Sequence, residues 1–253
     1  MTERMTLAFF DTCSRHPDDT NSRFVIAEKM ARVRAAIRRI LFTAERLGAP
    51  VLSTTCLGIQ RCAPGMCVRS TCGAPASSGA WASAEIEGPT AFVAMNATPA
   101  EVAVALRCRQ IVLERQSCKT GDDNVRLRTF DVFGVNKHTA TIVRSFGERH
   151  WLVFGAGFEH CLVSAVEGLR ALGLRVTVLE DGCIHGGRSI PATFLRTFER
   201  LRMLGAEWSS FDEICGEYSL GEGLPHEPAA GVPARHPSAP IDVESQAAVI
   251  GTP

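Results

Sequence analysis

One segment of this chain reads as a strand, a tight turn and a helix in immediate succession. An apolar run, Trp151–Phe154, leads into Gly155 and Gly157, and helix-compatible sequence extends from Cys161 to Gly173. A buried strand followed directly by a helix is the repeating unit of parallel α/β folds, because parallel strands need a crossover connection. The segment therefore predicts an α/β fold and places Cys161 in the first turn of a helix.

The same alternation of strand and helix patterns runs through most of the chain. Short apolar runs predict strands, and apolar residues spaced three and four apart predict amphipathic helices. Strands are predicted at 6–10, 50–54, 111–113, 151–154, 175–179 and 207–211, and helices at 26–47, 99–106, 139–146, 162–172 and 190–204. This order predicts a three-layer α-β-α, Rossmann-like sandwich around a mostly parallel sheet of about six strands.

Cys161 is a candidate nucleophile because of its predicted position. The first turn of a helix carries free N–H groups and the positive end of the helix dipole, which together stabilise a thiolate. The same N–H groups can form an oxyanion hole. The ordinary alternative for a single cysteine is a buried and inert thiol. The glycine-rich turn just before Cys161 favours the reactive interpretation.

Two charged residues stand at the ends of other predicted strands. Asp11 follows the run 6–10, and Arg115 follows the run 111–113. The carboxyl ends of parallel strands meet along one edge of the sheet, where the chemistry of such folds gathers. We therefore expect Asp11, Arg115 and Cys161 to lie near one another. Taken alone, Asp11 is equally typical of a turn or capping residue at a strand end.

These segments, in this order, resemble the cysteine hydrolases of the isochorismatase-like superfamily, which includes nicotinamidases and N-carbamoylsarcosine amidase. The resemblance is carried by Gly155–Ala165, Phe9–Thr12, Ile111–Gln116 and Phe130–Phe133, and it covers roughly residues 5–216. It implies an enzyme, a hydrolase acting on carbon–nitrogen bonds other than peptide bonds. The implied substrate is a small amide, imide or carbamoyl compound, cleaved through a covalent cysteine intermediate.

The resemblance also implies a role for individual residues. Asp11 matches the catalytic carboxylate of the family, and Cys161 matches its nucleophile. The backbone N–H groups of Gly157 and Cys161 match its oxyanion hole, next to a cis peptide bond expected at Ala156–Gly157.

The catalytic lysine of the family is missing from its usual place. Arg115 stands there instead, and Lys119 follows four residues later. Three outcomes stay open. Arg115 replaces the lysine, or Lys119 folds back into the site, or catalysis is impaired and the fold serves as a binding or scaffold protein. Oxidant sensing through Cys161 is a further alternative.

No metal and no other cofactor is expected. Classical nicotinamidases carry Asp and His metal ligands after the second strand, but residues 53–62 contain no histidine. Four thiolates can bind zinc or an iron–sulfur cluster, yet the evenly spaced cysteines of the next segment lack the Cys-x-x-Cys pairs typical of such sites. We interpret them as free thiols in a loop. They are Cys56, Cys62, Cys67 and Cys72.

Composition limits the kinds of partner. The chain has 27 basic and 27 acidic residues, so its zero net charge favours neither nucleic acid nor an anionic membrane. No apolar run reaches the roughly 20 residues of a membrane span, and no signal peptide is visible. We expect a cytoplasmic protein with a small-molecule substrate, and the resemblance implies a homo-oligomer. Residues 1–216 are the predicted hydrolase domain, and the proline-rich residues 217–253 are a predicted flexible tail.

Overall fold

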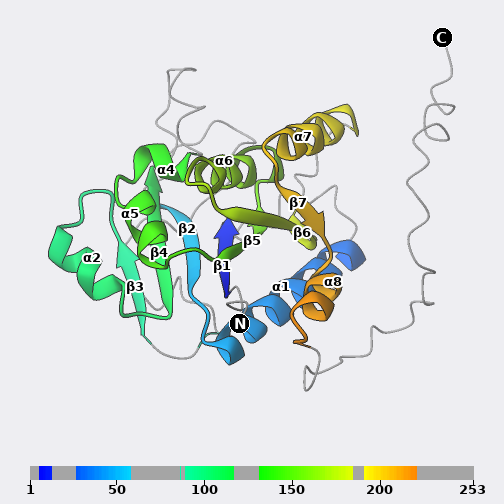
Figure 1. The fold of residues 1–253 in the computed structure, drawn as a ribbon. Helices are drawn as coiled ribbons and strands as arrows, with labels where there is room; N and C mark the ends of the chain where they lie inside the picture. Colours follow the sequence, from blue (N-terminus) through cyan, green and yellow to red (C-terminus); the bar gives the residue numbers. More distant parts are fainter. Residues whose placement is uncertain are drawn as a thin grey trace, which may run out of the picture. The chain divides into compact units, whose positions relative to one another are not determined.

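A single parallel sheet of seven strands forms the centre of the fold, in the order β3-β4-β2-β1-β5-β6-β7 (Figure 1). Every neighbouring pair of strands is parallel. The strands are β1 (Leu7–Thr12), β2 (Val51–Leu57), β3 (Thr90–Val93), β4 (Gln110–Gln116), β5 (His150–Ala156), β6 (Arg175–Ile184) and β7 (Glu207–Ser209). The computed structural model describes residues 6–12, 27–57, 86, 89–116, 131–184 and 191–220. The α/β prediction is confirmed, and the sheet has one strand more than expected and no antiparallel pair among the described strands.

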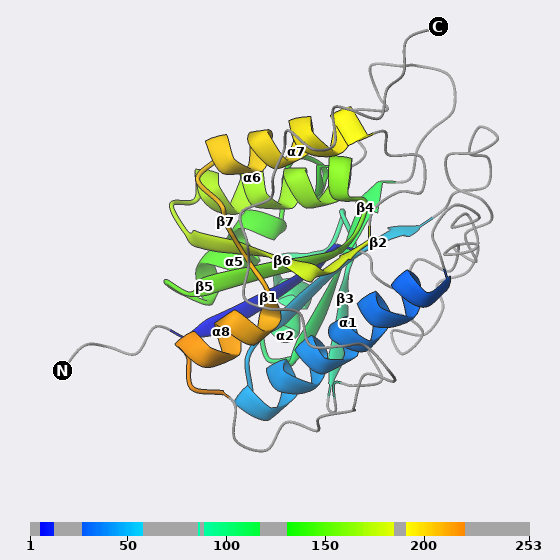
Figure 2. The ribbon, with the colours of Figure 1, turned by 90° about the vertical axis from the view of Figure 1, so that its right-hand side faces the viewer.

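Helices cover both faces of the sheet (Figure 2). Helices α6 and α7 lie over one face, and α1 and α8 lie over the other, which confirms the three-layer prediction. The helices are α1 (Ala27–Leu47), α2 (Pro99–Ala105), α4 (Val132–Val135), α5 (Thr139–Ser145), α6 (Val163–Ala171), α7 (Pro191–Met203) and α8 (Phe211–Glu217). A π-helical turn, η3 (Phe158–Leu162), joins β5 to α6.

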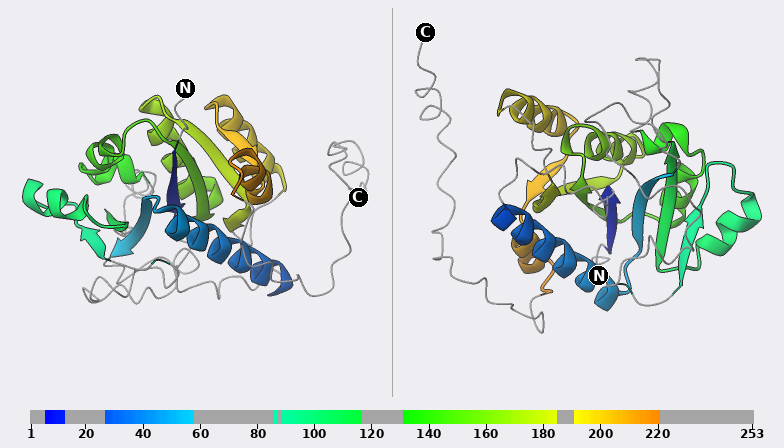
Figure 3. Two further views of the ribbon diagram at one scale, coloured as in Figure 1. Left: turned by 60° about the horizontal axis from the view of Figure 1, so that its bottom comes forward. Right: turned by 180° about the vertical axis from the view of Figure 1, so that it is seen from behind.

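The two helices on the second face lie side by side (Figure 3). Arg39 of α1 forms an ion pair with Asp212 of α8, and its guanidinium lies 5.5 Å from the ring centroid of Phe211. The cation therefore has both a carboxylate and an aromatic face as partners. These contacts link the first described helix of the chain to the last.

Helix α1 behaves as its sequence pattern predicts. Arg32, Arg34 and Arg38 are exposed on its outer face, and Gly48 ends it with a positive φ of 61°. A left-handed glycine is a common helix terminator, because it has no Cβ to clash. Ser22, a residue type that suits the N-cap of a helix beginning near residue 26, lies outside the described residues. Neither α1 nor any other helix in the described part of the chain is long and apolar enough to cross a membrane.

The central strands are buried on both faces, as parallel strands with helices on both sides must be. Phe10, Leu52, Ile111 and Val153 are neighbours in register and lie in the core beneath α6. Because side chains alternate along a strand, the residues next to them face α1 and α8. This apolar layer fixes the register, since a slip of one residue would turn it toward the other face.

Three elements were not predicted from the sequence, namely β3, α4 and α8. Strand β3 is only four residues long and lies at the edge of the sheet, where partial exposure weakens the apolar signal. Helix α8 begins after Ser210, which forms a reciprocal capping box with Glu213. A Ser-x-x-Glu spacing is a recognised helix-start signal, so this helix was predictable. Its presence ends β7 at Ser209, two residues before the predicted limit.

A buried amide holds α4 against the sheet. Asn136 is fully buried, and its side-chain Nδ2 donates to the carbonyls of Val93 (3.1 Å) and Glu114 (2.9 Å). Its Oδ1 accepts the backbone N–H of His138 at 3.1 Å. The carbonyl of Glu114 belongs to the residue directly before Arg115. Asn136 therefore fixes the backbone at the carboxyl end of β4.

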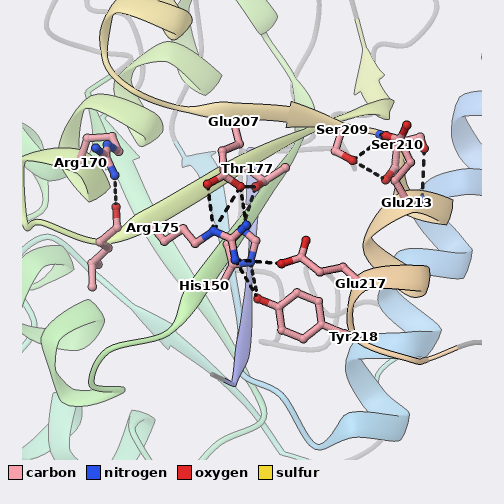
Figure 4. A network of polar contacts seen from close by, with 11 residues as sticks. His150, Arg170, Arg175, Thr177, Glu207, Ser209, Ser210, Glu213, Glu217 and Tyr218 are labelled. Atoms are coloured by element: carbon pink, nitrogen blue, oxygen red, sulfur yellow. Dashed lines mark hydrogen bonds and ion pairs between the residues drawn. The ribbon is translucent and has the colours of Figure 1, made fainter. Parts of the chain in front are cut away.

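A second polar network joins α8 to the amino ends of the strands (Figure 4). His150 is fully buried, with Nδ1 2.6 Å from the Tyr218 hydroxyl and Nε2 2.7 Å from Thr177 Oγ1. Arg175 forms an ion pair with Glu207 at 2.7 Å beside it. Burial lowers the pKa of His150 to about 4, and the nearby positive charge of Arg175 lowers it as well. The imidazole is therefore neutral at physiological pH.

We predict that replacing Asn136 strongly destabilises the fold. Asn136→Leu leaves two buried carbonyls without a donor, and the free energy of unfolding should fall by about 3 kcal/mol. Lys137→Ala is the matched control, because this neighbouring side chain is exposed and should change the value by less than about 0.5 kcal/mol. Urea unfolding measures both variants, and equal stability of the two would contradict the role given to Asn136.

We also predict that acid destabilises the protein through His150. Its pKa is about 4 when folded and 6.5 in its ordinary state, so between these values the unfolded chain binds a proton that the native state does not. The free energy of unfolding should therefore fall by about 1–3 kcal/mol as the pH drops from 6.5 to 4. His150→Gln cannot titrate and should lose this part of the pH slope. Urea titrations at pH 7, 6 and 5 measure it, and an unchanged slope would refute the assignment.

Candidate active site

The predicted site residues lie at the carboxyl edge of the sheet. Asp11 is the residue before the last of β1 and pairs in register with Phe154 of β5, and Arg115 lies near the end of β4. Cys161 follows β5 in the η3 turn. All three side chains are buried, with exposed fractions of 4% for Asp11, 4% for Arg115 and 8% for Cys161. The strand order places only β2 between the strands of Arg115 and Asp11.

Arg115 reaches the cysteine directly. Its Nη1 donates to Cys161 Sγ at 2.5 Å, in a contact buried between residues 46 positions apart in the sequence. Arg115 is two residues beyond Leu113, which packs in the core beneath α6, so the arginine lies on that same face. A guanidinium stays protonated at any physiological pH and has only donors. The contact therefore places the sulfur next to a permanent cation.

Two glycines shape the turn between β5 and the cysteine. Gly157 has a left-handed conformation (φ 75°, ψ 47°), and a Cβ there would lie 2.7 Å from Cys161 Sγ. Gly155 has φ 114°, and a Cβ there would lie 2.8 Å from Asp11 Oδ1. Both positions therefore require glycine for conformation and for space. The carboxylate and the sulfur pack against backbone atoms only two residues apart.

Local geometry around the cysteine differs from the prediction in two ways. Cys161 lies in a π-helical turn, and the α-helix proper begins only at Val163. Such turns are rare and occur frequently at functional sites. No cis peptide bond occurs among the described residues, so the bond expected to be cis at Ala156–Gly157 is trans. The left-handed Gly157 redirects the chain instead, and its carbonyl accepts the N–H groups of His160 and Leu162.

Aromatic packing anchors the η3 turn. Phe158 is fully buried and stacks on Phe194 of α7, with ring centroids 5.2 Å apart. The ring also meets Trp208 of β7 edge-on at 5.7 Å. Offset and edge-to-face pairs of this kind contribute beyond the area they bury. Phe158 therefore fixes the start of the turn that presents Cys161.

Several predicted residues cannot be placed. Lys119 lies outside the described residues, as do Cys62, Cys67 and Cys72. Cys56 belongs to β2, where it pairs in register with Arg115. Within the described ranges, no group of three or more His, Cys, Asp or Glu side chains is arranged to hold a metal ion.

Two hydroxyl side chains at this edge of the sheet were not predicted from the sequence to belong to the site. Thr12 is buried and donates its Oγ1 to the carbonyl of Phe154 at 3.0 Å, which ties the end of β1 to β5. Thr54 is buried near the end of β2. A hydroxyl residue just where a buried apolar strand ends is the signal that identifies both.

The comparisons with solved structures extend over most of the chain. An isochorismatase family protein from Desulfovibrio vulgaris matches with a TM-score of 0.52 and 17% identity over 85% of this chain and 99% of that one. A pyrazinamidase from Pyrococcus horikoshii, in complex with zinc, matches with a TM-score of 0.54 and 14% identity over 81% and 99%. The MAR1 ribonuclease from Caenorhabditis elegans matches with a TM-score of 0.50 and 12% identity over 88% and 86%.

No protein-family model and no curated protein matches the sequence. The names of the three solved structures do not refer to one common activity, so the fold that they share does not specify a substrate. The described residues form no donor set for a metal like the zinc bound to the pyrazinamidase, and we derive no chemistry from one. The likeness establishes that this chain has the α/β fold of the isochorismatase-like hydrolases.

Proposed function

We propose that this protein is a cysteine hydrolase that cleaves a carbon–nitrogen bond of a small amide, imide or carbamoyl substrate. The buried contact between Arg115 and Cys161 carries the proposal, because it pairs a potential nucleophile with a permanent cation. Asp11 supports it, since its carboxylate packs against the same glycine turn as the sulfur. The fold shared with a pyrazinamidase is consistent with amide chemistry. We further propose that the enzyme acts in the cytoplasm as a homo-oligomer.

In the first half of the proposed reaction, the Cys161 sulfur attacks the carbonyl carbon of the substrate. Asp11 receives the thiol proton and passes it to the leaving nitrogen. The carbon–nitrogen bond then breaks, the amine or ammonia departs, and a thioester to Cys161 remains. The N–H groups of Gly157 and Cys161 are the proposed donors to the oxyanion.

In the second half, water attacks the thioester carbon. Asp11 accepts one proton from the water, the carbon–sulfur bond breaks, and the carboxylic acid product leaves. The proton returns from Asp11 to the sulfur, which restores the starting state. Arg115 takes no part in proton transfer, because its guanidinium does not titrate in this range. We assign to it the stabilisation of the negative charge on sulfur when the thiol proton leaves and again when the carbon–sulfur bond breaks.

The second candidate is a binding or scaffold protein with impaired catalysis. Replacement of the usual lysine by Arg115 favours it, because a planar guanidinium and a compact ammonium are not interchangeable at a tight site. Burial of Cys161, Asp11 and Arg115 is also compatible with a closed, inactive site. Turnover separates the two candidates.

We predict that turnover depends on Cys161 and Asp11. A panel of small primary amides, carbamoyl compounds and cyclic imides is assayed by release of ammonia or, for the imides, by ring opening. Cys161→Ala and Asp11→Asn should each lower kcat/KM by at least about 100-fold, since they remove the nucleophile and the proton carrier. Cys108→Ala is the control, because this half-exposed thiol lies beyond α2, and it should keep wild-type activity. Absence of turnover on the whole panel would favour the non-catalytic candidate.

We predict that Arg115 is the cationic member of the site and that Lys119 is not. Arg115→Met removes the charge and should lower kcat by about 100-fold or more. Arg115→Lys keeps a positive charge and should retain part of the wild-type kcat. Lys119→Ala should leave kcat unchanged. The reverse order, with loss of activity in Lys119→Ala and none in Arg115→Met, would exclude the assignment. Thermal unfolding of each variant shows whether lost activity is lost structure.

A further inference from the structure

A layer of side chains separates the apolar core from the candidate site. Thr54 of β2 pairs in register with Leu113 of β4, and on the next strand Thr12 pairs with Gly155 of β5. Leu113 packs in the core beneath α6, and the alternation of side chains places Arg115 on that same face. Thr54 is two residues beyond the core residue Leu52, so it also lies on this face, one side-chain step below Arg115.

Thr54 differs from its polar neighbours in one respect. Its side chain is 5% exposed, and its Oγ1 has no hydrogen-bond partner within the described part of the chain. Thr12 at the same level donates to a carbonyl at 3.0 Å, and Ser53 accepts from Gln110 Nε2 at 3.2 Å. Buried polar groups in native proteins are nearly always paired, and an unpaired one destabilises the folded state. Unpaired groups that persist are expected at functional sites.

We propose that the Thr54 hydroxyl is a substrate-binding group of the active site. It forms a hydrogen bond with a polar group that the substrate carries next to the carbon attacked by Cys161. The inference rests on the proposed function, in that it takes Cys161 as the reacting residue. Thr54 is about as buried as Arg115 and Cys161, and the register of β2 and β4 places it on the face of the sheet that carries Arg115. The substrate class is thus a compact molecule with a hydrogen-bonding group beside its reacting carbon.

Alkylation of Cys161 tests this without requiring hydrolysis. Iodoacetamide carries a polar amide beside its reacting carbon, whereas iodoethane carries none. The ratio of their second-order rate constants at Cys161, located by mass spectrometry, reports recognition of the polar group. Comparing this ratio between variants cancels the different intrinsic reactivities of the two reagents.

The isosteric variant Thr54→Val removes only the hydroxyl, and the ratio should fall about fivefold, the effect of one hydrogen bond. Thr54→Ser keeps the hydroxyl and should restore most of the ratio. The melting temperature of Thr54→Val should be equal to or above the wild-type value. Thr43→Val is the matched control, because the buried Thr43 hydroxyl already donates to the Arg39 carbonyl at 2.9 Å within α1. Its ratio should equal that of the wild type.

An unchanged ratio in Thr54→Val would overturn the inference. A fall in the ratio would also overturn it if the melting temperature falls as well and Thr54→Ser does not restore the ratio. The proposed function is judged separately. If the wild type hydrolyses no amide while the ratio still falls, Thr54 binds a ligand and the hydrolase proposal fails. If amides are hydrolysed and the ratio does not change, the hydrolase proposal survives and the role of Thr54 does not.

Discussion

Arg115 carries a permanent charge into a part of the molecule with little access to water, and a buried cation is tolerated only when its partners are well placed. Its contact with Cys161 is one such partner, and the surrounding structure maintains it. Asn136 holds the backbone just before the arginine, and Phe158 anchors the turn that carries the cysteine. Gly157 lets that turn approach the sulfur, because any side chain there would collide with it.

The two ends of the parallel sheet carry different sets of buried polar groups. At the amino end, His150, Thr177 and Tyr218 satisfy one another, and the result is a stable attachment for the last described helix. At the carboxyl end, the buried Thr54 hydroxyl has no hydrogen-bond partner within the described residues, although Trp151 Nε1 near the amino end lacks one as well. Proteins give up local stability at sites that bind and transform ligands, and they recover it elsewhere in the fold.

Much of the architecture was predictable because local patterns and the fold agree. The central strands are apolar on both faces, so their sequences are continuous apolar runs, and Gly48 ends α1 where predicted. The edge strand β3 was missed because partial exposure removes that signal. Helix α8 was missed although its capping box is visible in the sequence. The π-helical form of η3 has no simple sequence signal, since it depends on how the turn packs against α7.

The amino-acid sequence was sufficient to predict most strands and helices in their order, the three-layer architecture, and the placement of Asp11, Arg115 and Cys161 at or just after strand ends. The sequence did not reveal that the Arg115 guanidinium contacts the Cys161 sulfur or that Asn136 supports the strand end. Nor did it reveal that the Thr54 hydroxyl has no partner within the described part of the chain. The reason is physical. Composition and periodicity record which residues are buried, because burial follows from local apolar spacing. Which buried groups meet depends on strand order and register, and these are set by the packing of whole faces across distant parts of the chain.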